Sequence, residues 1–162
     1  MTLDEKKKLL EETVKELLEK MGFKATIYTA IDATINESPA DTAISVEIQV
    51  DDSNYLIGKR GINLAALQHI TRVVIKKRSE EKINFTIDIN NYRQDQKQSI
   101  IRIAQEMARK ALSERKAVLL RPMTAYERRL VHIELAKIEG VVTESIGDGP
   151  DRKVVIKPAS LI

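Results

Sequence analysis

The sequence predicts an α+β protein built from two parts, and the spacing of its apolar residues and its size support this fold class. Stretches whose apolar residues recur every three or four positions are interspersed with stretches whose apolar residues recur every second position, which predicts a mixture of helices and strands. At 162 residues with 43% hydrophobic content, the chain can bury a core. The charge also changes sign along the chain, because residues 1–90 hold 13 Lys and Arg against 15 Asp and Glu, whereas residues 91–162 hold 14 against 9. The basic second half suggests either a polyanionic partner or an ordinary solvated basic surface.

The composition excludes several kinds of chemistry. The sequence contains no Cys, which excludes disulfides, thiolate metal sites and cysteine nucleophiles and is consistent with a reducing cytosol. Its first residues carry charges every few positions and lack the apolar run of a signal peptide or a membrane span. We therefore expect a cytoplasmic protein with no integral membrane segment.

The first part is expected to begin with an amphipathic helix over residues 3–21, because apolar residues recur there at helical spacings and Gly22 follows them. Residues 24–31 are rich in β-forming side chains, and residues 42–50 alternate apolar with polar positions, which predicts two adjacent strands. The intervening segment over residues 36–41, NESPAD, is typical of a turn.

Two helices and a third strand are expected to complete the first part. A short helix precedes the glycine turn Gly58-Lys59-Arg60-Gly61, and a longer helix over residues 62–78 follows it. The apolar residues that follow the helical period in the longer helix are Ile62, Ala65, Ala66, Ile70, Val73 and Val74. From Ile83 to Ile89 apolar and polar residues alternate, which predicts a strand with one buried face.

The second part is expected to open with a long helix over residues 92–118, followed by a short strand within residues 117–121. The residues on the inner side of this helix are Ile100, Ile103, Ala104, Met107, Ala111 and Leu112. Thr124 and Glu127 have the spacing of a capping box, which predicts another helix that Gly140 stops. The tail is typical of a β-hairpin, with VVTESI and KVVIKP joined by a glycine-rich turn.

The Gly-Lys-Arg-Gly turn, hereafter the GKRG turn, has the parts needed to bind a phosphodiester backbone. Its glycines permit positive φ and carry no side chain that would hold a ligand away from the main chain. Gly61 opens a helix whose free amides and positive dipole end favour phosphate, and Lys59 and Arg60 add positive charge. Two glycines at this spacing can also be no more than a tight turn between helices, with no role in binding. The patterns of nucleotide-binding loops are not present.

The order of elements over residues 1–91 resembles a type II KH domain, in which a GxxG loop joins two helices packed on one face of a three-stranded sheet. Residues 56–62, LIGKRGI, are similar to the signature of that family. The resemblance implies that the loop clamps single-stranded RNA, with Ile57, Gly58, Lys59, Arg60, Gly61 and Ile62 as binding residues. The residues expected to border an apolar groove for unpaired bases are Ile57, Ile62, Val46 and Ile48.

Arg128 and His132 lie four positions apart in the second part, so one helical face presents a permanent cation beside an imidazole that can donate to phosphate. An isolated Arg-x-x-x-His can equally be a core or capping His beside a solvated ion pair. Residues 97–157 resemble the domain named for its invariant Arg and His, a small α/β domain with antiparallel strands that binds single-stranded nucleic acid.

This second resemblance predicts a domain over residues 92–162, and it places the motif on Arg128 and His132. Arg129 is expected to assist them. Arg121 and Arg152 are expected to extend the basic patch.

A type II KH domain joined to an Arg-x-x-x-His domain resembles the bacterial Jag family, also called KhpB, the proteins associated with the SpoIIIJ membrane insertase. The resemblance implies a cytosolic RNA-binding protein, a post-transcriptional regulator or RNA chaperone, that pairs with a small KH-domain protein or with itself. Single-stranded DNA stays open as a ligand. The family typically carries a further N-terminal domain and a linker, whereas this sequence begins at the KH helix, so we expect a short member or a shortened chain.

Two other classes of function stay open. A metal-dependent nuclease would need converging carboxylates, but Asp51 and Asp52 are typical of a strand-to-helix turn and Asp88 of the polar face of a strand. A protein-interaction adaptor could use the KH fold as a dimer surface. We expect no catalytic residues, no cofactor and no metal site.

Overall fold

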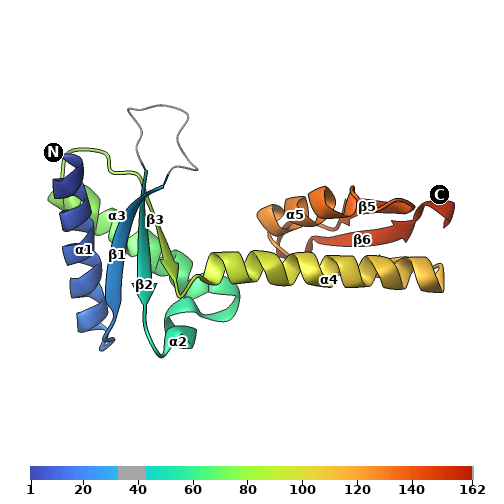
Figure 1. Cartoon of the computed structure of the whole chain (residues 1–162), viewed down its shortest axis with the longest axis horizontal. Coiled ribbons are helices and arrows are strands. Elements are labelled where there is room, and N and C mark those ends of the chain that lie inside the picture. Colours follow the sequence, from blue (N-terminus) through green and yellow to red (C-terminus); the bar gives the residue numbers. More distant parts are fainter. Residues whose placement is uncertain (33–42, 162) are drawn as a thin grey trace. The chain divides into compact units, whose positions relative to one another are not determined.

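The structure of the protein is a computed structural model that describes residues 1–32 and 43–161 (Figure 1). The chain divides into two compact units, Met1–Arg93 and Gln94–Ile162, and each contains a three-stranded sheet. The mixture of helices with two small sheets confirms the predicted α+β class. The turn predicted over residues 36–41 lies outside the described residues.

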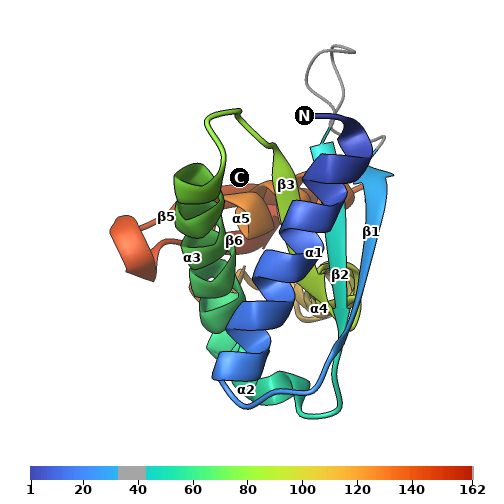
Figure 2. The same ribbon diagram turned by 90° about the vertical axis from the view of Figure 1, so that its left-hand side faces the viewer.

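The first unit packs the helices α1 and α3 on one face of its sheet (Figure 2). Strand β1 runs antiparallel to β2, and β3 runs parallel to β2 on its other side. The alternation predicted from the sequence places Ile44, Val46 and Ile48 on the covered face, where each is at most 1% exposed. The elements of this unit are α1 (Leu3–Lys20), β1 (Thr26–Asp32), β2 (Ala43–Gln49), α2 (Ser53–Ile57), α3 (Ile62–Arg78) and β3 (Phe85–Ile89).

The ends of α1 follow from local sequence. The Thr2 side chain accepts a hydrogen bond from the Glu5 amide at 3.2 Å, and the Glu5 carboxylate accepts one from the Thr2 amide at 2.7 Å. This capping box satisfies amides that a helix otherwise leaves free. The helix ends where Gly22 adopts a φ of 85°, as the sequence predicts.

Helix α3 is present as predicted, but the apolar residues that indicated it are not the ones that it buries. Ile62, Ile70 and Val73 are 66%, 48% and 47% exposed. The residues that face the sheet are Leu64, Leu67, Gln68, Thr71 and Ile75.

The buried Gln68 explains how a polar residue can occupy the inner face of α3. Its amide nitrogen donates to the Phe85 carbonyl at 2.8 Å, and its amide oxygen accepts from the Ile87 amide at 2.7 Å. The side chain therefore satisfies the outer edge of β3, the end strand of this sheet. Leu64, Leu67 and Ile75 are buried on the same face as Gln68, so Ile62, Ile70 and Val73 are exposed.

The second unit contains an antiparallel sheet in the order β4-β6-β5, with α5 beside β5 (Figure 1). The hairpin of β5 and β6 is confirmed. The elements of this part of the chain are α4 (Tyr92–Glu114), β4 (Val118–Leu119), α5 (Ala125–Leu135), β5 (Val141–Ile146) and β6 (Lys153–Pro158). No helix in the described ranges is both long and apolar enough to cross a membrane.

Two expectations for the second unit are wrong in detail. Helix α5 ends at Leu135 and not at Gly140. The amides of Lys137 and Ile138 then donate to the carbonyls of Glu134 and Leu135, so the chain continues in turns, and Ile138 packs against the core. Gly140 instead precedes β5 with a φ of 82°. On α4, small alanines centre the buried face, so Ile103 and Leu112 are 39% and 37% exposed.

Candidate nucleic-acid interface

The GKRG turn has a strained backbone and an exposed surface. Gly58, Arg60 and Gly61 have φ values of 71°, 55° and 77°, all in the region that favours glycine. The Gly58 amide donates to the main-chain carbonyl of Asn54 at 2.9 Å, at the end of α2, and the Gly61 amide donates to the carbonyl of Gly58 at 3.3 Å. Lys59 and Arg60 are exposed, and Gly58 and Gly61 are partly exposed. The turn therefore presents main chain and two cations to solvent.

The glycines are also required by the packing of the protein itself. A Cβ on Gly58 would lie 2.6 Å from Cγ of Asn63, whose amide nitrogen donates to the Tyr55 carbonyl at 2.8 Å. A Cβ on Gly61 would lie 3.0 Å from the ring of Tyr92. The sequence suggested access for a ligand as the reason for these glycines, and the structure adds internal contacts as a second reason.

The apolar residues near the turn do not form the groove that the sequence predicts. Val46 and Ile48 are 1% and 0% exposed, because they belong to the face of β2 that the helices cover. Ile57 is partly buried against the same core. Ile62 alone among these four is largely exposed, so it remains the one apolar side chain of the predicted groove that is available beside the turn.

Residues 128–132 of α5, hereafter the Arg–His segment, are tied into the second unit by hydrogen bonds. Arg128 donates to the Met123 carbonyl at 2.8 Å. The His132 ring lies between two hydroxyls of β5, with Nδ1 at 2.6 Å from Oγ1 of Thr143 and Nε2 at 2.8 Å from Oγ of Ser145. Burial and the neighbouring Arg128 cation lower the pKa of His132, so the imidazole is neutral at pH 7.

Thr143 and Ser145 are residues of this site that sequence reasoning missed. They stand two positions apart in a strand, so they share one face of β5. A neutral imidazole has one donor and one acceptor nitrogen, and a hydroxyl can serve either. Both ring nitrogens of His132 are thus hydrogen-bonded within the protein. The hydroxyls of Thr143 and Ser145 extend the polar site from α5 onto β5.

The other predicted cations of the second unit differ in how they are held. Arg121 lies 3.5 Å from the carboxylate of Glu127, which is only 7% exposed. Burial opposes ionisation of Glu127, but hydrogen bonds from the Thr124 amide and Gln96 and the Arg121 charge outweigh it and lower the pKa of Glu127. Arg129 and Arg152 are exposed, and neither forms an ion pair with any described residue.

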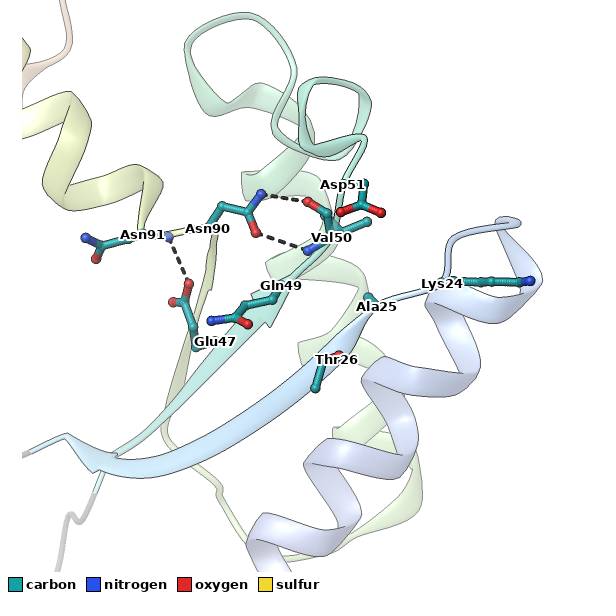
Figure 3. Close-up of a pocket in the computed structure, with 9 residues that line it drawn as sticks. All are labelled: Lys24, Ala25, Thr26, Glu47, Gln49, Val50, Asp51, Asn90 and Asn91. Carbon is teal, nitrogen blue, oxygen red and sulfur yellow. Dashed lines mark hydrogen bonds between the residues drawn. The ribbon is translucent and has the colours of Figure 1, made fainter.

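A polar hollow of about 730 Å³ lies at one end of the first sheet (Figure 3). The Asn90 side chain bridges the Val50 amide at 3.0 Å and its carbonyl at 2.7 Å, and the Asn91 amide donates to Glu47 at 2.8 Å. Burial raises the pKa of the Glu47 carboxyl. These groups hold the chain as it leaves β3, and the acidic lining does not favour phosphate.

The carboxylates considered for a nuclease do not converge in the part of the chain that the structure describes. Asp88 accepts hydrogen bonds from the amides of Ile89 and Arg93 at 3.0 and 3.2 Å, which is a capping role. Within the described ranges, no group of three or more His, Cys, Asp or Glu residues could hold a metal ion.

Comparison with known proteins identifies the second unit. Residues 98–158 match the model of the R-three-H domain, the domain named for Arg-x-x-x-His, so the molecule is an α+β protein that contains this domain. The chain is 34% identical over 151 residues to RNA-binding protein KhpB of Clostridium symbiosum, and this match covers 93% of the chain and 67% of the relative. It is 32% identical to RNA-binding protein KhpB of Bacillus subtilis, over 77% of the chain and 60% of the relative.

A third relative, RNA-binding protein KhpB of Lactiplantibacillus plantarum, is 37% identical over 62% of the chain and 31% of its own length. The chain therefore spans from about a third to two thirds of the length of these relatives. On these matches the chain belongs to the KhpB family, the family that its sequence resembles.

Proposed function

We propose that this chain binds single-stranded RNA, through the GKRG turn of its first unit and through the Arg–His segment of its second. The name of its relatives, RNA-binding protein KhpB, supports the choice of ligand. The first unit has the helix, strand and turn order of the type II KH domain proposed for residues 1–91. The R-three-H match supports the domain proposed for residues 92–162.

The observation that carries this proposal is the exposure of the GKRG turn. Phosphate contacts supply most of the affinity of a protein for a nucleic-acid strand, and they need cations and amides that a polymer can reach. Lys59 and Arg60 are exposed and meet this requirement, in a turn whose backbone is left-handed at Arg60 and Gly61. The side chain of Ile62 follows directly and offers an apolar surface to a base.

In the cell, the proposed role is that of a cytoplasmic bacterial post-transcriptional regulator or RNA chaperone, without enzymatic activity. In the second unit, Arg128, Arg129 and the exposed Arg152 would contact the strand. The hydroxyls of Thr143 and Ser145, which His132 holds in place, would add neutral hydrogen-bonding groups.

Reversing the two charges of the turn tests the proposal. The change Lys59→Asp with Arg60→Asp keeps both glycines, and Asp tolerates the left-handed backbone of position 60. We expect at least about a tenfold loss of affinity for a short single-stranded RNA at low salt, because like charge then faces phosphate. The slope of log affinity against log salt should also fall by about 1.4, at about 0.7 for each phosphate contact.

A matched control separates contact at the turn from net charge. Lys76→Asp with Lys77→Asp makes the same charge change at two exposed positions at the far end of α3. Affinity should then change by less than about threefold. Equal losses in both variants, or no loss in the first with circular dichroism unchanged, would contradict the assignment of the turn. Parallel titration with DNA of the same sequence decides between RNA and single-stranded DNA.

A second function, that of a protein-interaction adaptor, is favoured by one observation. Ile62, Ile70 and Val73 form an exposed apolar face along α3, and large apolar faces commonly mark protein contacts. The proposed partner is a second KH fold, either another copy of this chain or a small KH-domain protein. Sedimentation of the wild type and of Ile70→Glu tests self-association, which the variant should abolish. If the wild type is monomeric, the remaining proposed partner is the small KH-domain protein. The wild type should then pull down that protein, and Ile70→Glu should not.

A further inference from the structure

We infer that Tyr126 is a stacking platform for one unpaired RNA base, placed beside the Arg–His segment of α5. This inference rests on the proposed RNA binding and adds a subsite to it. The tyrosine ring would take the base, and the neighbouring arginines would take the phosphates on either side of it.

Tyr126 is one of few aromatic side chains available to a ligand. The sequence has four Tyr, two Phe and no Trp. Tyr126 is 66% exposed, and its hydroxyl forms no hydrogen bond with the described residues. A single exposed ring is common on protein surfaces, so its meaning depends on what surrounds it.

The surroundings of Tyr126 combine a cation with an apolar side chain. Arg129 and Ile133 follow Tyr126 by three and seven positions, so all three lie on one face of α5. Arg129 is exposed and forms no ion pair within the described part of the chain, and Ile133 is 49% exposed. Proteins that bind single strands typically place aromatic rings for stacking next to arginines that follow the backbone.

The backbone that carries the ring is held before any ligand binds. Tyr126 is the second residue of α5, within a capping box in which the Thr124 amide donates to Glu127 at 2.8 Å and the Glu127 amide donates to Thr124 at 3.3 Å. Two residues later, Arg128 donates back to the Met123 carbonyl at 2.8 Å. A tyrosine on a fixed helical backbone has only two side-chain torsions to restrict on binding, which favours stacking.

The charge around Tyr126 favours a nucleic acid as its ligand. Residues 91–162 carry 14 Lys and Arg against 9 Asp and Glu, and this net positive charge favours a ligand that carries phosphates. Tyr28 provides a contrast within the same molecule. It is 53% exposed, but it pairs across the sheet with Glu47, which in turn pairs with Asp88. The same ring in that acidic setting should not bind RNA.

The test compares a fluorescein-labelled oligouridylate with an abasic ribose-phosphate oligomer of the same length, using the full chain. Tyr126→Ala should weaken binding of oligouridylate by about fivefold to a hundredfold, the range expected for one stacked base. Binding of the abasic oligomer should be unchanged, since the phosphates still meet the arginines. Tyr126→Phe should bind both oligomers as the wild type does, and Tyr28→Ala is the matched control that should also do so.

The outcomes separate this inference from the proposed function. If the wild type binds both oligomers in a salt-dependent way and Tyr126→Ala binds them equally well, the stacking role is overturned and RNA binding stands. If Tyr126→Ala weakens both oligomers by the same factor, the ring supports the site without stacking, which also overturns the inference. If the wild type binds neither oligomer at low salt, the proposed function fails first. A loss of self-association with no change in RNA affinity would assign Tyr126 to a protein contact instead.

Discussion

The two basic sites of this protein differ in how closely their binding groups are tied to the fold. In the GKRG turn, Lys59 and Arg60 are exposed, and the glycines between which they stand carry the structural constraint. In the second unit, Arg128 and His132 make hydrogen bonds to Met123, Thr143 and Ser145.

This difference means that charge and stability can be changed separately at Lys59 but not at Arg128 and His132. A substitution of the exposed Lys59 should affect ligand binding with little change in stability. A substitution of Arg128 or His132 should affect stability and binding together. Variants of both units, taken in decreasing order of their effect, test this contrast.

The greatest loss of stability is expected from Gly58→Ala. The φ of 71° is unfavourable for alanine, and its Cβ would meet Asn63 at 2.6 Å. We expect the free energy of unfolding of the first unit to fall by about 2–3 kcal/mol, at the upper end of the cost of a strained residue. Urea denaturation combined with hydrogen exchange of the amides of β2 and β3 measures this loss.

Gly22→Ala is the matched control for that experiment. Gly22 has a φ of 85°, but a Cβ added there would have nothing within 4 Å, so only the backbone strain applies. Its cost should be about 1 kcal/mol. Equal losses in the two variants would show that Asn63 moves aside and that the glycine at position 58 is not needed for packing.

An intermediate effect is expected from His132→Ala. This change removes both hydrogen bonds to β5, each worth about 0.5–1.5 kcal/mol, so the second unit should lose about 1–3 kcal/mol of stability as well as RNA affinity. Arg129→Ala should lower RNA affinity with a change in stability of less than about 0.5 kcal/mol. Thermal unfolding followed by circular dichroism measures the stability of both variants, and RNA titration measures their affinity. An unchanged melting temperature for His132→Ala would remove the contrast between the two sites.

A weaker effect is the pH dependence of the second unit. The pKa of His132 is lowered in the folded protein, whereas the unfolded chain titrates near 6.5. Below about pH 6.5 the unfolded chain therefore binds more protons than the folded one. As the pH is lowered from about 6.5 to the pKa of His132 in the folded protein, the free energy of unfolding of the second unit decreases. Above about pH 6.5 the ring is neutral in both states, and the stability that the neutral ring provides is fully present.

Melting curves between about pH 8 and pH 5 measure this dependence, a range that stays above the titration of most carboxylates. His132→Ala should remove the part of the pH dependence that belongs to the second unit. The same slope in the wild type and the variant would show that the ring does not titrate as its contacts indicate.

Local signals in the sequence predicted the parts of the structure that depend on neighbouring residues. The capping box of Thr124 and Glu127, the glycine turn at residues 58–61 and the hairpin of β5 and β6 are present where the sequence places them. The alternation in β3 also identified the buried face correctly. Each of these signals depends on hydrogen bonds or periodicity within a few residues, so the sequence carries it directly.

Contacts between distant residues could not be predicted in the same way. The sequence contains no sign that Gln68 would bond the edge of β3 from the buried face of α3. The spacing of Thr143 and Ser145 predicts that both hydroxyls lie on one face of a strand. It does not predict that this face lies opposite the His132 ring, where the structure places it.

Residue patterns alone were enough to predict the order of helices and strands, the narrow cationic turn and the position of the Arg–His motif on a helix. Packing between elements made Val46 and Ile48 core residues, turned Ile62, Ile70 and Val73 outward, and engaged both nitrogens of His132. This division arises because helical and strand periodicity specifies which residues share a face, whereas only contact with another element specifies which face meets solvent.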